Sequence, residues 1–405
     1  MKKLFIFLCA GGLIFSLTSP ILAGGIINKQ NFSAEYLRTF SRNAATDAAD
    51  VTVFNPAGVM KMEDGTYVDL GIFHALKDYS NTFSGIESES DEPSTVPGLF
   101  GLYKKGKWAG FAAFTIPGGG GKVEYDKGTA TTNTLANALL ASPAFSAIDN
   151  QKLEAESVYY GYTVGGAYAV NDMISLSLGA RYIDATKEAK GSATLSNPAP
   201  PMTFAIDYEE TADGWGYFLG LNIAPTNELN IGIRLETKTE LDFKTKVIKD
   251  TIPGGYLVDG AKEREDLPGL LGLGIAYTFS PTVTIDASFT YYFETSATLE
   301  DNRFKDAGNS YDAAVALTYT FNPKLKGSLG YMYTVTSIDP DDMLPEAPEL
   351  DAQTVCAGIL YEVSPDLNLN FALMNTFYDK ETRSDGIILD KNITGFGFGI
   401  QYKFK

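Results

Sequence analysis

Few residues in this chain of 405 have side chains suited to covalent chemistry. The sequence contains one histidine, His74, and two cysteines, Cys9 and Cys356. A Ser-His-Asp triad or a histidine-ligated metal ion needs histidine beside several other groups, so a lone histidine argues against both. We therefore expect that the protein is not an enzyme and that it has neither a cofactor nor a metal site.

Residues 1–23 have the pattern of an export signal. They begin with two lysines after the initial methionine, continue with an apolar run that ends at Leu17, and finish on the small residue Ala23. This order of charged, apolar and small residues is typical of a signal peptide, and the run is too short for a spanning helix. Cleavage after Ala23 would leave Cys356 as the only cysteine, which excludes an internal disulfide.

Most of the remaining chain alternates apolar with polar residues, as a β-strand with one apolar face does. In residues 282–294, for example, every second side chain is apolar and those between are mainly Thr, Ser and acidic residues. Such runs occur in pairs joined by short turns, at residues 104–107, 170–172, 225–227, 280–281, 322–323 and 364–365. Longer connections separate the pairs, at residues 80–97, 117–156, 187–211, 245–266, 296–307, 337–350 and 381–391.

The length of these runs distinguishes a membrane barrel from a soluble sandwich. Strands of about ten residues cross a bilayer at a tilt, whereas strands of soluble sheets are commonly about 5–6 residues long. Strict alternation of short turns with long loops is typical of outer-membrane barrels, in which first and last strands must pair. We therefore predict an all-β fold, a 14-stranded antiparallel transmembrane β-barrel formed by residues 64–405.

Residues 24–63 fit neither the export signal nor the alternating pattern. The segment is small and polar, and it contains the turn Asn55-Pro56-Ala57. Pro56 has a fixed φ and keeps Asn55 out of the helical region, and the side chain of Asn55 can close the turn. A disordered leader is the alternative, but the segment also holds too many apolar residues for a solvated tail. We expect it to fold back as a plug, or hatch, inside the barrel lumen.

Three parts of this segment resemble a known family: the mature start Gly24-Gly25-Ile26-Ile27-Asn28, the middle Asn43-Ala44-Ala45, and Asn55-Pro56-Ala57. They are similar to the plug of outer-membrane long-chain fatty acid transporters of the FadL type, which include importers of aromatic hydrocarbons. Residues 108–120 resemble the third strand of that family and the start of its third loop. The resemblance implies transport of hydrophobic compounds, most of all long-chain fatty acids. The alternative is a general diffusion porin for small polar solutes.

The resemblance also implies where a ligand binds and leaves. A hydrophobic ligand would bind beside the start of the plug, at Ile26, Ile27 and Phe32. An amphipathic helix over residues 134–148 would offer Leu135, Leu139 and Phe145 to the ligand, or else pack on a neighbouring loop. The ligand would then leave sideways where the third strand is kinked, at Phe111, Phe114, Pro117, Gly118 and Gly119.

Two arginines point into the lumen according to the alternation. Arg181 and Arg234 carry forked guanidinium groups, which bind carboxylates well, and a fatty acid would present such a group. Inward Glu236 and Asp286 supply the alternative, in which the arginines pair across the lumen.

Acidic residues gather in two of the long loops, within residues 87–92 and 339–351. Oxygen ligands could hold Ca²⁺ or Mg²⁺ that bridges lipopolysaccharide phosphates, but no calcium-loop spacing is present and a solvated loop is the commoner explanation. A formal net charge of −18 argues against nucleic acid, because phosphate binding requires Lys and Arg. We expect a monomer whose partners are a fatty acid or an arene, outer-membrane lipid and lipopolysaccharide.

Overall fold

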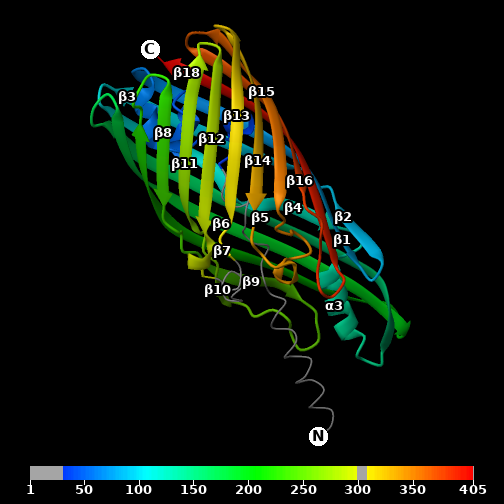
Figure 1. Cartoon of the computed structure of the whole chain (residues 1–405). Coiled ribbons are helices and arrows are strands. Elements are labelled where there is room, and N and C mark those ends of the chain that lie inside the picture. The colour runs from blue at the N-terminus through cyan, green and yellow to red at the C-terminus, as the bar shows by residue number, and fades with distance from the viewer. Residues whose placement is uncertain (1–30, 299–307, 405) are drawn as a thin grey trace.

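The computed structural model describes residues 31–298 and 308–404. Figure 1 shows that strands make up nearly all of it. No helix in these two ranges is long and apolar enough to cross a membrane. The expected signal peptide, Ile26 and Ile27 lie outside the described residues.

Fourteen strands of the described ranges close into a barrel. Each strand pairs antiparallel with the next, and the last strand pairs with the first from Thr66↔Phe404 to Thr82↔Ile388. The predicted fold class is therefore confirmed. The strands are β1 Gly65–Phe83, β3 Ser94–Lys105, β4 Trp108–Tyr125, β5 Phe145–Ala169, β6 Ile174–Pro198, β7 Met202–Ile223, β8 Leu229–Glu236, β11 Gly269–Ser280, β12 Val283–Phe293, β13 Tyr311–Asn322, β14 Leu325–Val335, β15 Ala352–Ser364, β16 Leu367–Tyr378 and β18 Ile388–Phe404.

The two ends of the barrel differ as predicted. In Figure 1 the C-terminus and the short turns lie at one end, whereas helix α3 (Ala130–Leu139) lies towards the other. The connections at the α3 end also carry the short strands β2 Ile86–Ser90, β9 Asp242–Asp250, β10 Lys262–Arg264 and β17 Glu381–Thr382, and the single helical turns η3 Glu294–Ser296 and η4 Pro340–Asp342.

The predicted loops 117–156 and 187–211 are wrong for most of their length. Strands β5 and β6 continue side by side from the barrel to Phe145 and Pro198, and β6 pairs with β7 as far as Met202. One face of these extensions is buried, since Ala193 and Leu195 of β6 and Phe204 of β7 pack in an apolar cluster with α3. The intervening residues are largely small or polar, so the alternation is weaker there, although the backbone pairing continues.

The barrel wall sorts its side chains as the alternation predicts. On β1, Leu70, Ile72 and Leu76 are exposed on the outer face, whereas Asp69 and Lys77 are buried on the inner face. Exposed aromatic residues lie beside the short turns, where interfacial aromatic girdles of membrane barrels occur. They include Tyr277, Phe279, Tyr319, Phe321, Tyr402 and Phe404.

The N-terminal segment fills the lumen as a plug, which the predicted fold includes. It consists of the short helix α2 Ala34–Leu37 and the turns η1 Ala49–Val53 and η2 Pro56–Lys61, drawn in blue inside the barrel in Figure 1. Ser33 caps α2, because its Oγ accepts a hydrogen bond from the Tyr36 amide at 2.9 Å. The plug is buried almost throughout, so its apolar residues join the core cluster of the barrel.

The wall carries glycine where the plug backbone comes closest. A Cβ atom at Gly330 of β14 would lie 2.5 Å from the carbonyl oxygen of Thr39, and one at Gly232 of β8 would overlap the carbonyl oxygen of Asn43. The inward row at the end of β18 also contacts plug side chains, with Gly397 against Leu37. The absence of side chains at these positions allows the plug to pack directly on the wall.

Candidate functional site

The Asn55-Pro56-Ala57 turn fixes the plug to one side of the barrel. Nδ2 of Asn55 donates to the carbonyl oxygens of Asn43 at 3.2 Å and of Leu221 on β7 at 3.1 Å. Oγ of Ser175 on β6 donates to the carbonyl oxygen of Ala57 at 2.7 Å. The expectation that the Asn55 side chain closes the turn is wrong, since a backbone hydrogen bond from Gly58 closes it. The side chain instead ties the plug to the wall.

The inward arginines are paired rather than open to a ligand. Arg181 lies 3.2 Å from Glu236, and Arg234 also forms an ion pair with Glu236. Nη1 of Arg234 donates to the carbonyl oxygen of Val53 in the plug at 2.7 Å. The arginines thus pair with an inward acid, as in the predicted alternative, but the pairing is along the wall between β6 and β8 and not across the lumen, and Asp286 takes no part in these ion pairs. Arg234 holds the plug as well.

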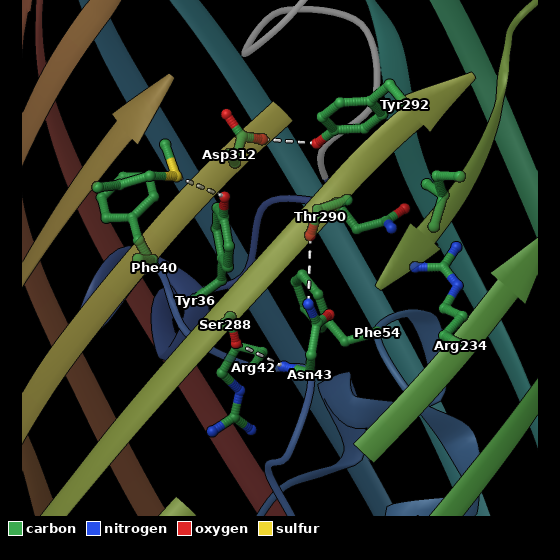
Figure 2. Close-up of a pocket in the computed structure, with 14 residues that line it drawn as sticks. Tyr36, Phe40, Arg42, Asn43, Phe54, Arg234, Ser288, Thr290, Tyr292 and Asp312 are labelled. Atoms are coloured by element: carbon green, nitrogen blue, oxygen red, sulfur yellow. Dashed lines mark hydrogen bonds between the residues drawn. The ribbon is translucent and has the colours of Figure 1, made fainter. Parts of the chain in front are cut away.

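A small cavity lies between Arg234 and the plug, as Figure 2 shows. Its volume is about 30 Å³, enough for one or two water molecules but too small for a fatty acid. On one side the hydroxyl of Tyr292 donates to Asp312 at 2.6 Å. On the other, Nδ2 of Asn43 donates to Thr290 at 3.2 Å, and the ring of Tyr36 faces the cavity.

Three buried carboxyl groups meet between the plug and β1. Oxygen atoms of Glu35, Asp50 and Asp69 lie within 4.8 Å of one another. Asp50 accepts from Arg42 Nε at 3.0 Å and from Ser33 Oγ at 2.7 Å. Burial, and then the negative charge of Asp50, raise the pKa of Glu35 to about 7, although Arg42 opposes the rise. The buried position of Glu35 between plug and wall therefore favours its protonated form.

An apolar cavity lies on the other side of the plug. It has a volume of about 200 Å³ and is lined by the plug and by strands β1, β3, β4, β5, β16 and β18. Phe32 of the plug stacks on Phe73 of β1, with ring centroids 4.6 Å apart and planes at 28°. Val96, Met374 and Ile393 complete the apolar lining. Phe32, which the sequence analysis predicted to lie beside a ligand, therefore lines this cavity.

The wall is interrupted beside this apolar cavity. Pairing between β3 and β4 ends at Leu99↔Phe114, and residues 94–98 of β3 pair only with β1 in the described structure. Beyond Phe114, β4 pairs with β5, and its register shifts between Thr115 and Gly118 and again between Gly118 and Gly121. Extra residues of this kind bend a strand away from its neighbour. We call the interruption between residues 93–98 and 115–122 the window.

The residues predicted for a lateral opening fall at different places relative to the window. Pro117, Gly118 and Gly119 lie in the irregular segment, and Gly119 has a φ of +86°, which suits glycine. Phe114 forms the last ladder pair below the window. Phe111 lies in the regular ladder and points into the lumen, where its ring packs 6.3 Å from that of Phe218.

The residues predicted on a loop helix do not line either cavity. Helix α3 ends at Leu139 and not at residue 148, and Phe145 begins strand β5. Leu135, Leu139 and Phe145 pack in a separate apolar cluster, with Phe145 5.6 Å from Phe204 between ring centroids. The structure therefore agrees with the alternative, a helix that packs on its neighbours at the outer end of the barrel.

Most residues that line the apolar cavity were not predicted, and Lys77 is the most notable of them. It lies on the inward row of β1, and its Nζ atom donates to the carbonyl oxygens of Gly120 at 2.9 Å and Lys122 at 2.6 Å. The alternation places Lys77 inward, but only the fold brings the kinked segment of β4 within its reach.

The fold and the cavities together define a class of protein: a plugged β-barrel with an apolar cavity that meets an interruption in its wall. No protein-family model and no curated protein matches the sequence. Solved structures do match it along nearly their whole length. A FadL homologue of Pseudomonas aeruginosa is 18% identical, with 95% of this chain and 100% of that chain covered and a TM-score of 0.69.

Two further structures have the same architecture. The toluene transporter TodX of P. putida is 16% identical, with 91% of this chain and 99% of that chain covered and a TM-score of 0.66. The toluene transporter TbuX of Ralstonia pickettii is 15% identical, with 91% and 99% covered and a TM-score of 0.64. At such identities the likeness concerns the fold, and the chain has the fold of the FadL-type channels.

Proposed function

We propose that this protein carries hydrophobic small molecules across the outer membrane and is not an enzyme. The ligand binds in the apolar cavity beside Phe32 and leaves through the window. The observation that carries this proposal is that the two edges of the window also line the cavity, namely Pro93 with residues 94–96 of β3, and residues 119–122 of β4. A ligand in the cavity therefore lies against the interruption in the wall.

The plug and the window together favour apolar ligands over polar solutes. A plug that packs on the wall on several sides leaves a diffusing polar solute without a straight aqueous path. A hydrophobic ligand gains about 0.8 kcal/mol for each CH₂ group removed from water, and the lipid beyond the window preserves that gain. A polar solute would lose its hydration there. These arguments disfavour the alternative of a general diffusion porin.

Long-chain fatty acids are the ligands that we propose, with monoaromatic hydrocarbons as the second candidate. A cavity of about 150 Å³ in another protein holds benzene, so a cavity of about 200 Å³ accommodates one ring or part of an acyl chain. The rest of a long chain would extend into the window. Toluene transport is named for two proteins of the same fold, which supports the second candidate. Arg234 is assigned to seating the plug, and Arg181 to pairing with Glu236 on the wall.

Filling the cavity tests this function. Ala75 is buried on β1 and lines the cavity, so Ala75→Trp places an indole in the ligand space. Ala313→Trp on β13 is the matched control, because alternation with the buried Ala314 points its side chain outwards. We expect Ala75→Trp to reduce uptake of labelled oleate and toluene by cells at least tenfold, and Ala313→Trp to leave uptake unchanged.

The barrel content of each strain is matched by heat-modified mobility on gels. Wild-type uptake rates in Ala75→Trp, at equal barrel content, would overturn the assignment of the cavity. Wild-type cells that import neither compound would overturn the proposed function itself.

A further inference from the structure

Lys77 is a buried cation beside the proposed ligand. Its side chain is 5% exposed and lines the apolar cavity, and its Nζ atom reaches past the end of β3 to two carbonyl oxygens of β4. Those carbonyl groups, of Gly120 and Lys122, belong to the segment that forms one edge of the window. The ammonium group is thus a bridge between the regular strand β1 and the irregular part of β4.

The ammonium group of Lys77 lacks a carboxylate partner among the described residues. Its neighbour Lys122 differs, since Nζ of Lys122 lies 3.0 Å from Glu124 and 3.5 Å from Glu154. Glu92 and Glu156 act on Lys77 from a greater distance, without an ion pair in the described ranges. Burying a charge is costly unless an opposite charge compensates it. An anionic group in the cavity would supply what Lys77 lacks.

A second ammonium group lies near this end of the cavity, beside the ring of Tyr79. Nζ of Lys391 on β18 lies 5.5 Å from the ring centroid of Tyr79, and Nζ of Lys77 lies 5.7 Å from the same centroid. Lys391 donates to the carbonyl oxygen of Pro348. Tyr79 itself lines the cavity. The polar end of a ligand is therefore favoured here, and its apolar part is favoured near Phe32.

We propose that Lys77 receives the carboxylate group of the ligand and, by doing so, releases the edge of the window that it holds closed. A carboxylate carries a full negative charge, so it attracts an ammonium group more strongly than the partial charge of a carbonyl oxygen does. A carboxylate therefore competes with the oxygens of Gly120 and Lys122 for the ammonium group. This proposal rests on the proposed function, and it adds that an acidic ligand opens its own exit.

The irregular segment, residues 115–122 of β4, is held weakly by the sheet and can move when its hydrogen bonds to Lys77 break. Residues 115–122 have no ladder pairs with β3 in the described structure, and two register shifts weaken their pairing with β5. Gly119 and Gly121 have φ values of +86° and +69°, which place the chain outside ordinary strand geometry. The two hydrogen bonds from Lys77 therefore restrain a segment that the sheet restrains weakly. A neutral hydrocarbon makes no such exchange and leaves the two bonds in place.

The test compares an acid with its neutral ester. Binding and uptake of oleate and methyl oleate are measured for the wild-type chain, for Lys77→Met and for the control Lys152→Met. The control removes an equal charge from the neighbouring strand β5, and Lys152 does not line the cavity. We expect Lys77→Met to weaken oleate binding about tenfold, the loss typical of one charge-assisted hydrogen bond. We expect it to leave binding of methyl oleate unchanged and to speed uptake of methyl oleate, because the window is no longer held.

Hydrogen exchange measures the release directly. In the wild-type chain, oleate should speed amide exchange in residues 115–122, and methyl oleate should not. In Lys77→Met, exchange should be fast without ligand. Equal effects of the substitution on acid and ester would overturn the proposal and leave Lys77 a structural residue. Failure of Ala75→Trp to block uptake would instead overturn the cavity assignment, so the two failures are distinguishable.

Discussion

Asn55→Ala offers a quantitative view of how tightly the plug is seated. The substitution removes two hydrogen bonds, to Asn43 within the plug and to Leu221 on β7, and leaves both carbonyl oxygens without the amide donor. Only the bond to Leu221 joins the plug to the wall, and a typical buried hydrogen bond contributes about 0.5–1.5 kcal/mol, so the plug should lose about 1 kcal/mol of seating free energy. Because about 1.4 kcal/mol is a factor of ten, the population of unseated plug should rise about fivefold.

Single-channel recording in planar bilayers measures that population, since an unseated plug leaves a conducting lumen. Asn375→Ala is the matched control, because Nδ2 of Asn375 also makes two hydrogen bonds, to Asn392 and Thr394, but both partners lie on β18. We expect frequent openings in Asn55→Ala and rare openings in the control. Equal open fractions in the two variants would refute the idea that the Asn55 side chain holds the plug.

Two further predictions concern protons and topology. Seating raises the pKa of Glu35 from an ordinary value of 4.5 to about 7, so its stabilisation is complete below pH 4.5 and is lost as the pH rises towards 7. The thermal unfolding midpoint of the wild-type chain should fall over that pH range, and Glu35→Gln should flatten the dependence of the midpoint on pH. An unchanged slope in the variant would contradict the assignment. Residues 337–350 should be cut by protease added to intact cells, and a tag beside Pro281 should be protected. Labelling at Pro281 from outside would reverse the topology.

The barrel could be predicted because lipid imposes a simple rule on each strand. Outward residues such as Leu70 and Ile72 must be apolar, and inward ones such as Asp69 need not be, so the alternation alone gives the strands and their count. Beyond the lipid the rule no longer applies. Residues 187–198 of β6 continue as strand, but their buried face includes small residues such as Gly191 and Ala193, so the alternation is weak and the sequence predicted a loop there.

The cavity could be predicted only in part. Phe32 was placed beside the ligand, and the Pro-Gly run of residues 117–119 lies at the window. Lys77 was missed, because its role depends on two carbonyl groups more than forty positions away, which only the closed barrel brings close. For Arg181 and Arg234 the sequence suggested a ligand contact that the structure does not have, because both guanidinium groups form ion pairs with Glu236.

The glycines of the wall are positions at which the fit of the plug could be changed without changing the barrel. A methyl group at Gly232 or Gly330 would collide with plug backbone, whereas the ladder hydrogen bonds of β8 and β14 involve only the main chain. The fit of the plug thus depends on the absence of side chains at these glycines, whereas the pairing of the strands depends on main-chain atoms. Alanine at these positions would evict the plug from an intact cylinder, and a foreign plug could be accepted only by a barrel whose glycines match its contours.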